Sequence, residues 1–335
     1  MPAEIRRVLI VRHDRIGDWV VTSPVVAMLA ELLPHAEIDV LASPVNAALV
    51  RADARIARVI VNDHSWRGWQ RARRELRARD YDLILSTIYG RSLREGLVAA
   101  LAGRRQTFSV SVFRPRRYQG LFSKTVRVPP SWRHMAERML YLAQHAVRGE
   151  ALSRDASTAR WRMHLGTDAL ADDRAASFVA AHGLTDFVAV NLSAAEANRE
   201  WPPALCAATL QLLLAAHETL SFVLTPPPGK EGAAAEVVRL CDSPRVVMAP
   251  ASAQLIGLVA LLRRARVVIT PDTANVHLAS AVGRPVLGLF TQGPTPVLWA
   301  PFGVPFRLVI SGSRAVADIA PGAIARAFAD LLQSL

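Results

Sequence analysis

Short apolar segments alternate with amphipathic segments of helical length along the chain of 335 residues. This alternation is typical of parallel β-sheets that carry helices on both faces. In the first half the predicted strands are Arg7–Val11, Ile38–Ala42, Val59–Val61 and Leu83–Ser86, and the predicted helices are Pro24–Leu33, Arg67–Arg79 and Ser92–Leu101. In the second half we predict a helix over Asp168–His182, strands over Phe187–Leu192, Ser221–Leu224, Arg245–Met248, Val267–Thr270 and Val286–Phe290, and a last helix over Pro321–Leu335.

Helix boundaries and a polar stretch divide the chain. Ser23 followed by Pro24 predicts a helix start, because a hydroxyl cap precedes a proline at the first helical position. Gly183 predicts a helix end. The mixed polar stretch 149–167 separates two series of elements. We therefore expect an α/β protein of two doubly wound, Rossmann-like domains, residues 1–160 and 161–335, with the last helix free to pack back on the first domain.

The net charge of +12 comes almost wholly from arginine, since the lysines are Lys124 and Lys230. A guanidinium grips phosphate or carboxylate at two points, so the excess of positive charge predicts an acidic partner. A GC-rich genome explains the preference for arginine over lysine but not this excess. We expect no nucleic-acid partner, because neither aromatic platforms nor a recognised binding module is evident.

The two cysteines, Cys206 and Cys241, form neither a metal-ligand spacing nor a disulfide framework, which favours a reducing compartment. The apolar run Val8–Val11 is too short for the core of a signal peptide, and no apolar stretch reaches transmembrane length. We expect a cytoplasmic protein whose basic patches touch a membrane face at most peripherally.

Ligands of doubly wound sheets bind beyond the carboxyl ends of the strands, so we expect the functional residues in the loops after the strands. After the first strand, residues 12–19 read RHDRIGDW. Gly17 permits a tight or left-handed turn, and Asp18 can take a proton from an acceptor hydroxyl. The alternative is that Asp18 only caps a helix or pairs with Arg12 or Arg15. Gly17 is the only glycine of this loop, which counts against a nicotinamide-binding fingerprint.

Two further loops belong to the second half. Residues 270–279 read TPDTANVHLA and open a helix, whose free N–H groups suit a diphosphate. Asp272 would cap this helix or hold a ribose hydroxyl, and His277 would reach a phosphate or simply pack between helix and sheet. Residues 193–203 read SAAEANREWPP, where Arg199 would neutralise a leaving diphosphate or be an ordinary surface arginine.

Two weaker patterns favour ordinary structure. Asp80 and Asp82 match the D-x-D pattern of metal-dependent sugar transferases, but they precede a strand and so lie at the wrong end of the sheet. Six arginines share one predicted helix, whose exposed face would be basic and hydrated. These arginines are Arg67, Arg71, Arg73, Arg74, Arg77 and Arg79.

Together the three loops resemble the heptosyltransferases of lipopolysaccharide core synthesis, glycosyltransferase family nine. The Gly-Asp that ends the family's first loop is matched by Gly17-Asp18, and its Lys-x-Trp-Pro element by residues 199–202 with arginine in place of lysine. Its Asp-Ser/Thr-Gly-x-x-His-Leu-Ala signature, followed by Gly-x-Pro, is matched by residues 272–279 and 283–285. The His-x-x-x-Arg helix of the family is matched by His134 and Arg138.

The resemblance implies a GT-B fold and inverting, metal-independent transfer from a nucleotide-heptose donor, usually ADP-heptose, without a cofactor. By position Asp18 resembles the catalytic base and Arg199 the cation on the donor phosphate. The implied donor-binding residues are Ser193, Glu231, Asp272, Thr273, Ala274 and His277. Arginines that would line an acidic acceptor site, such as a lipopolysaccharide core, are Arg12, Arg15, Arg91, Arg116 and Arg117, together with Arg94, Arg114 and Arg133.

Several residues depart from the family pattern. Ala274 replaces a glycine, Ala194 and Ala195 replace small hydroxyl residues or glycine, and one residue is inserted after Phe290. Two alternatives therefore stay open beside the transferase. One is a sugar-nucleotide epimerase on the same fold, and the other is a degenerate protein that binds a nucleotide sugar without turnover.

Overall fold

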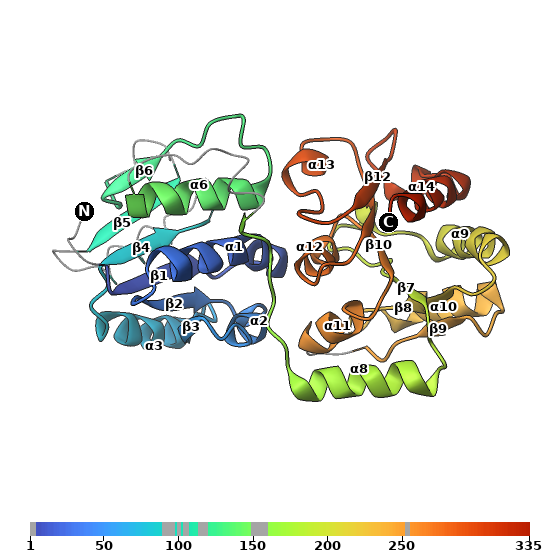
Figure 1. The fold of residues 1–335 in the computed structure, drawn as a ribbon, viewed down its shortest axis with the longest axis horizontal. Helices are drawn as coiled ribbons and strands as arrows, with labels where there is room; N and C mark the ends of the chain where they lie inside the picture. The colour runs from blue at the N-terminus through green and yellow to red at the C-terminus, as the bar shows by residue number, and fades with distance from the viewer. Residues whose placement is uncertain are drawn as a thin grey trace. The chain divides into compact units, whose positions relative to one another are not determined.

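The computed structural model describes residues 5–88, 98, 102, 107–112, 120–148, 160–251 and 255–335. The chain forms two compact units, Met1–Gly166 and Thr167–Leu335. Each contains a six-stranded, wholly parallel sheet between helices (Figure 1). The predicted class, two doubly wound α/β domains, is confirmed.

The sheet of the first unit has the strand order β3-β2-β1-β4-β5-β6. Its strands are β1 (Arg7–Arg12), β2 (Glu37–Ala42), β3 (Ile56–Val61), β4 (Leu83–Ser86), β5 (Phe108–Val112) and β6 (Lys124–Val126). The order reverses beside β1, so the loops after β1 and β4 diverge at the carboxyl edge of the sheet. Such a switch point is where ligands of this fold bind.

Helices cover both faces of this sheet. They are α1 (Ile16–Leu32), α2 (Ala47–Arg51), α3 (Trp66–Arg77) and α6 (Met135–Arg148). The helices α1 and α6 pack on each other over one face (Figure 1). On the other face Ala72 and Leu76 of α3 join Leu9, Leu41 and Ile84 of the strands in one apolar cluster.

The second unit repeats this plan with the strand order β12-β11-β10-β7-β8-β9. Its strands are β7 (Phe187–Val190), β8 (Ser221–Leu224), β9 (Val246–Met248), β10 (Val267–Pro271), β11 (Val286–Phe290) and β12 (Phe306–Ile310). Its helices are α8 (Ala169–Ala181), α9 (Pro203–Ala216), α10 (Glu231–Cys241), α11 (Leu255–Leu262), α12 (Ala274–Ala281), α13 (Thr295–Leu298) and α14 (Pro321–Gln333). The last helix, α14, packs on α9, β11 and β12 of its own unit.

Each predicted strand is present, with small shifts at its ends. Three strands were not predicted from the sequence. In β5 the buried Ser109 and Ser111 interrupt the apolar pattern, β6 is short and starts with Lys124, and β12 is an edge strand with exposed residues at both ends. The predicted helix Ser92–Leu101 lies almost wholly outside the described residues.

The predicted start of the first helix at Pro24 is wrong. The helix begins at Ile16, so Gly17 and Asp18 lie in its first turn, and Pro24 lies inside it. Proline lacks the N–H that would bond to the carbonyl four residues earlier. The Ser23 hydroxyl donates to that carbonyl, Val20 O, at 2.7 Å, and also accepts from the backbone N–H of His164 at 2.9 Å. Ser23 therefore repairs the helix instead of capping it.

We expect the change Ser23→Ala to lower the free energy of unfolding by about 1–3 kcal/mol, because it removes the partner of a buried carbonyl, Val20 O, and of the part-buried N–H of His164. Denaturant unfolding measures the effect. The change Ser177→Ala is the matched control: the Ser177 hydroxyl also bonds a carbonyl of its own helix, at 2.9 Å, but at an exposed position. Equal losses in the two variants would contradict this role of Ser23.

The boundary expected between residues 160 and 161 falls inside the first unit. The residues just after it are tied to α1. Trp161 Nε1 donates to Glu31 Oε2 at 3.0 Å, and His164 N donates to Ser23. The second unit starts where Asp168 caps α8 by accepting from Ala171 N at 2.8 Å.

Candidate functional site

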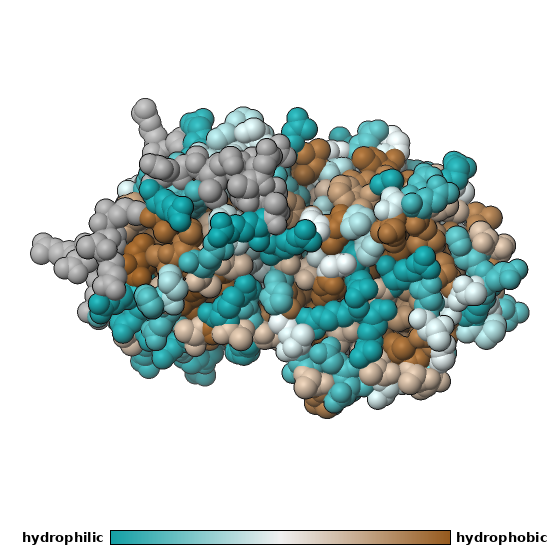
Figure 2. Space-filling model, viewed as in Figure 1, coloured by the Kyte–Doolittle hydropathy of each residue, from teal (hydrophilic) through white to brown (hydrophobic). Residues whose placement is uncertain are grey.

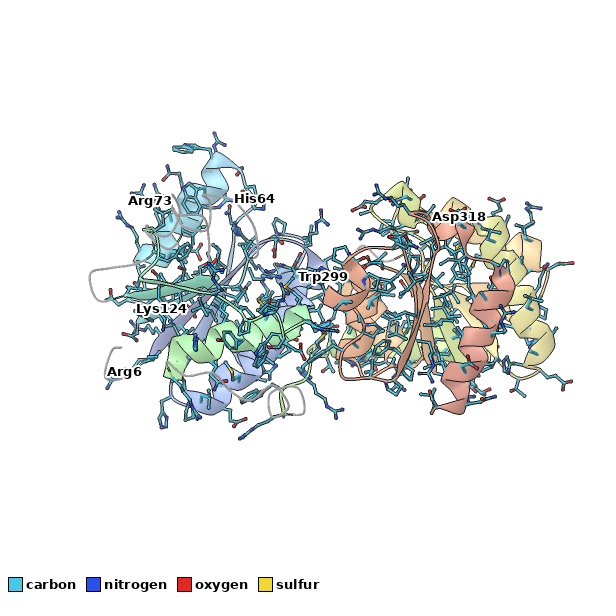
Figure 3. The ribbon with its side chains drawn as sticks, turned by 90° about the horizontal axis from the view of Figure 1, so that it is seen from above. Arg6, His64, Arg73, Lys124, Trp299 and Asp318 are labelled. Carbon is cyan, nitrogen blue, oxygen red and sulfur yellow. The ribbon has the colours of Figure 1, made fainter. Side chains whose placement is uncertain are left out.

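The loops after β1, β2 and β3 meet at the carboxyl edge of the first sheet. The Ser43 hydroxyl, after β2, donates to Asp14 O at 2.8 Å, and Asn46 Nδ2 donates to Arg12 O at 3.0 Å. The rings of His13, after β1, and His64, after β3, lie 5.4 Å apart. His64 has a left-handed backbone with φ of 62° (labelled in Figure 3). These contacts fix the loop between β1 and α1, which leads into the helical turn that carries Asp18.

Arg12, the last residue of β1, bonds to residues on both sides of this loop. Its side chain is 1 % exposed, and its Nη2 donates to Asp18 Oδ1 at 2.8 Å. Its Nε donates to the backbone oxygen of Asp18 at 2.9 Å and lies 3.3 Å from Asp14 Oδ1. Its Nη1 donates to Thr87 O, after β4. Arg12 is thus a buried guanidinium that internal partners hold against Asp18. Its predicted role in binding the acceptor stays a prediction.

Asp18 shows the pairing that the sequence left as an alternative to catalysis. One carboxylate oxygen accepts from Arg12, while the side chain keeps 18 % of its surface exposed. The pairing thus fixes the orientation of a carboxylate that solvent and a ligand can still reach. Its role as a base stays a prediction.

The other predicted acceptor residues divide into two groups. Arg15 precedes α1 and is exposed, and Arg133 is exposed before α6. The remaining ones lie outside the described residues: Arg91, Arg94, Arg114, Arg116 and Arg117. The matched residues His134 and Arg138 bond to the backbone around the start of α6: His134 Nδ1 accepts from Ala136 N, and Arg138 Nε donates to Trp132 O.

In the second unit the predicted Arg199 and Asp272 form an ion pair. Arg199 Nη1 lies 3.1 Å from Asp272 Oδ2, and Arg199 Nε lies 3.3 Å from Glu196 Oε2. The Arg199 side chain is 25 % exposed and that of Asp272 is 7 % exposed. Burial raises the pKa of the Asp272 carboxyl, while Arg199 and a hydrogen bond from Thr295 oppose that shift. This ion pair connects the loop after β7 to the loop after β10.

The start of α12 lies directly beside this pair. The Thr273 hydroxyl caps the helix by accepting from Asn275 N at 3.3 Å, and Thr273 and Ala274 are partly exposed. The helix N-terminus is thus accessible next to Arg199, and N–H groups beside a cation are the groups that an anion such as a diphosphate requires.

A buried asparagine that we did not single out from the sequence supports the same loops. Asn191, directly after β7, donates from Nδ2 to Ser193 O at 3.0 Å and to Thr270 Oγ1 at 3.1 Å. Its Oδ1 accepts from Ser193 N at 3.1 Å. Asn191 therefore fixes the predicted Ser193, which is partly exposed. An asparagine that directly follows an apolar strand is the signal that would have identified it.

The two remaining predicted donor residues, His277 and Glu231, differ in solvent exposure. His277 is 3 % exposed and contacts the ring of Trp299 at a centroid distance of 5.6 Å (Trp299 is labelled in Figure 3). Its predicted contact with a phosphate stays a prediction. Glu231 starts α10 and is partly exposed, and no residue in the described part of the chain bonds to its carboxylate. Its neighbour Lys230 binds Glu200 at 2.9 Å, which brings the loop after β8 beside that of Arg199.

The D-x-D pattern lies at the opposite edge of the first sheet. Asp82 Oδ2 accepts from the N–H groups of Arg6 and Arg7 at 2.8 and 2.9 Å, so it joins the starts of β4 and β1. Within the described ranges, no three His, Cys, Asp or Glu side chains converge as a metal site requires.

We expect Asp272→Asn to raise the melting temperature of the protein at neutral pH, with a larger gain than at pH 4. The pKa of the Asp272 carboxyl is raised in the folded state, so the protonated carboxyl stabilises the fold at pH values below its unfolded pKa near 3.8. This stabilisation is lost as pH rises through the raised pKa. Asparagine removes the buried charge. Thermal unfolding across this pH range measures the effect. A lower melting temperature at neutral pH would show that the ion pair with Arg199 stabilises the fold by more than burial of the carboxylate destabilises it.

A family model described as glycosyltransferase family 9 (heptosyltransferase) matches residues 69–318 of the chain. No curated protein matches it by sequence. Among solved structures, it is similar to a glycosyl transferase family 9 protein from Veillonella parvula DSM 2008, with a TM-score of 0.84, 17 % identity, and coverage of 100 % of this chain and 99 % of that one.

Two Escherichia coli structures are also similar. For ADP-heptose LPS heptosyltransferase II the TM-score is 0.78 at 19 % identity, with 98 % of this chain and 99 % of that one covered. For heptosyltransferase WaaC with ADP the values are 0.74 and 19 %, with 97 % and 99 % covered. At this identity the likenesses show the fold, which is of the GT-B type.

Proposed function

The chain belongs to glycosyltransferase family 9, the heptosyltransferases, and from that membership we propose that it transfers a heptose from ADP-heptose to a hydroxyl of an acidic glycan, such as a lipopolysaccharide core. This membership makes the protein a glycosyltransferase and favours transfer over the epimerase alternative. The degenerate binding protein is separated from the transferase by the turnover test below. The donor proposed here is the nucleotide sugar named for its E. coli neighbours.

The observation that carries the proposal is the Arg199–Asp272 pair beside the start of α12. A nucleoside diphosphate needs a cation and N–H donors on its phosphates and a polar partner for its ribose. Arg199 supplies the cation, and the first turn of α12 supplies the N–H donors. Asp272 would accept a hydrogen bond from a ribose hydroxyl, a role that would not require it to approach phosphate.

In the proposed reaction, the oxygen of the acceptor hydroxyl attacks the anomeric carbon of the heptose as the bond from that carbon to the β-phosphate oxygen breaks. The Asp18 carboxylate takes the hydroxyl proton, and ADP leaves with the electron pair. Arg199 and the α12 amides stabilise the growing negative charge on the diphosphate. Attack opposite to the leaving group inverts the anomeric configuration.

Arg12 is a positioning residue in this scheme. It bonds both the carboxylate and the backbone oxygen of Asp18 and connects them to the loop after β4 through Thr87. This arrangement holds the base in one orientation before the acceptor arrives, which is how a preorganised site lowers a barrier. The exposed Arg15, three residues before Asp18, is suited to an acidic group of the acceptor.

The test is a transfer assay with ADP-heptose and a lipopolysaccharide core acceptor in excess chelator. We expect ADP release and a heptose added to the acceptor, at a rate unchanged by the chelator, because Arg199 and a helix N-terminus replace a divalent ion on the diphosphate. Activity that disappears with chelator and returns with magnesium or manganese would contradict metal independence. Binding of ADP-heptose without transfer to any core acceptor would overturn the proposed function.

A further inference from the structure

The turn that carries Arg199 is tied to the loop after the edge strand β12. This turn is the short 3₁₀ helix η1 (Ala197–Arg199), which follows β7. Asn198 Nδ2 donates to the backbone oxygen of Arg314, after β12, at 2.8 Å. The next side chain, that of Arg199, lies 3.1 Å from Asp272, after β10. One turn therefore connects the loop after the edge strand to the candidate site.

The chain after Arg199 is fixed independently of this bond. Glu200 accepts from Lys230 Nζ at 2.9 Å. Trp201 is 1 % exposed and lies in the apolar core of the second unit. Residues 195–198, before Arg199, are exposed. The bond to the loop after β12 therefore holds the side of the turn that core packing does not hold.

The loop that accepts this bond is itself held by internal hydrogen bonds. Ser313 Oγ donates to Asp318 and accepts from the N–H of Ala315 at 3.0 Å (Asp318 is labelled in Figure 3). The N–H of Ser313 donates to Ser311 Oγ at 3.1 Å. The short helix η2 (Val316–Asp318), which continues this loop, lies beside η1. The carbonyl in the middle of this loop is thus a fixed anchor for η1.

The ion pair with Asp272 does not by itself set the direction of the Arg199 guanidinium. Arg199 Nε and Asp272 Oδ2 are buried, but neither makes a hydrogen bond to a described residue. Glu196 Oε2 lies 3.3 Å from Arg199 Nε, but Glu196 directly precedes η1 and would move with the turn. The direction of the guanidinium therefore depends on what fixes the turn.

The bond from Asn198 to Arg314 lies at a polar surface. Asn198 is exposed, Figure 2 shows hydrophilic residues over much of the second unit's face in view, and no helix in the described ranges is long and apolar enough to cross a membrane. Because Asn198 is exposed, water can replace either partner of its bond, so the bond contributes little to the free energy of unfolding. Its effect is on the direction of the turn rather than on stability.

We propose that Asn198 is a positioning residue for Arg199 in the transfer reaction. Its bond to the Arg314 carbonyl fixes the rotation of η1, and η1 holds the guanidinium beside the start of α12. A diphosphate would then meet a cation whose place is set before the ligand arrives, which lowers the cost of reaching the transition state. The inference rests on the proposed function, since the diphosphate is the ligand proposed for Arg199.

The test is a double-mutant cycle in the transfer assay with ADP-heptose, made of Asn198→Ala, Arg199→Gln and the double variant. We expect Asn198→Ala to lower kcat about 10-fold at an unchanged KM, since a misplacement of about 1 Å costs up to about 10²-fold. In the Arg199→Gln background the same change should alter kcat by less than about twofold, because only residues that act independently multiply their effects. The melting temperature should stay that of the parent, since the bond is exposed.

A second readout does not depend on turnover. The Nε–H resonance of Arg199 in the nuclear magnetic resonance spectrum of protein labelled with ¹⁵N-arginine is identified by its absence in Arg199→Gln. It should shift or broaden in Asn198→Ala. Gln211→Ala is the matched control, because Gln211 Nε2 also donates to a backbone oxygen, Leu240 O at 3.0 Å, from an exposed position of the same unit. The control should leave both the resonance and kcat unchanged.

Three outcomes overturn the proposal: an Arg199 resonance unchanged by Asn198→Ala, an undiminished loss of kcat when Asn198→Ala is added to Arg199→Gln, or an equal effect of Gln211→Ala. A parent protein that transfers no heptose would instead overturn the proposed function. The Arg199 resonance then decides the positioning role by itself.

Discussion

Replacing Asp18 with asparagine lowers the turnover of heptosyl transfer by about 10²–10⁴-fold, the usual contribution of a general base. Asparagine has nearly the same shape, and its side-chain oxygen can still accept the bond that Arg12 donates to Oδ1 at 2.8 Å. The helix and the loop therefore stay as they are, and only the capacity to accept a proton is lost. Turnover at saturating donor and acceptor measures the effect.

Donor affinity is the internal control for this variant. The residues proposed to hold ADP-heptose, Arg199 and the start of α12, belong to the second unit, so its dissociation constant should not change. Turnover within a few-fold of the parent would show that the pair with Arg12 is the whole role of Asp18. Asp14, 28 % exposed and 3.3 Å from Arg12 Nε, would then be the next base to test.

The change Arg199→Gln has the second large effect, a fall of about 10²–10³-fold in kcat, because a preorganised donor to the developing charge is lost. Lysine at this position should restore part of the rate, since it keeps the charge but not the planar fork. Steady-state kinetics of both variants with ADP-heptose measure the difference.

Arg266→Gln is the matched control for Arg199. Arg266 also pairs with an aspartate, Asp186 at 2.6 Å, but it lies just before β10, at the amino edge of the sheet. It should leave kcat unchanged. A loss of only a few-fold in Arg199→Gln, or an equal loss in the control, would contradict a role of Arg199 on the diphosphate.

The strand pattern was predictable because buried parallel strands are nearly continuous apolar runs, as in β4 and β11. The start of α1 was not, because its first turn, Ile16 to Trp19, has no side-chain cap and a better cap signal stands at Ser23. Only the bond from Ser23 to Val20, which is formed once the helix exists, reveals that Pro24 is internal.

In the candidate site, too, contacts that form only in the folded chain could not be predicted from the sequence. The proximity of Arg199 and Asp272 could be predicted, because both follow strands of one sheet at its carboxyl edge. The partners of Arg12 could not be predicted, because a basic residue at a strand end has the same sequence signal whether it faces a ligand or an internal carboxylate. Burial decides between these, and burial depends on Thr87 and Asp18, which reach Arg12 from other parts of the fold.

The Arg199–Asp272 pair also bears on how a product can depart. Arg199 already pairs with a carboxylate in the structure, while a quarter of its side chain is exposed. If a diphosphate binds Arg199 as proposed, it competes with Asp272 for the guanidinium, and Asp272, at 3.1 Å, stays beside the cation when the diphosphate leaves. In that scheme the residue that opposes the entry of a diphosphate is also the one that helps to expel it.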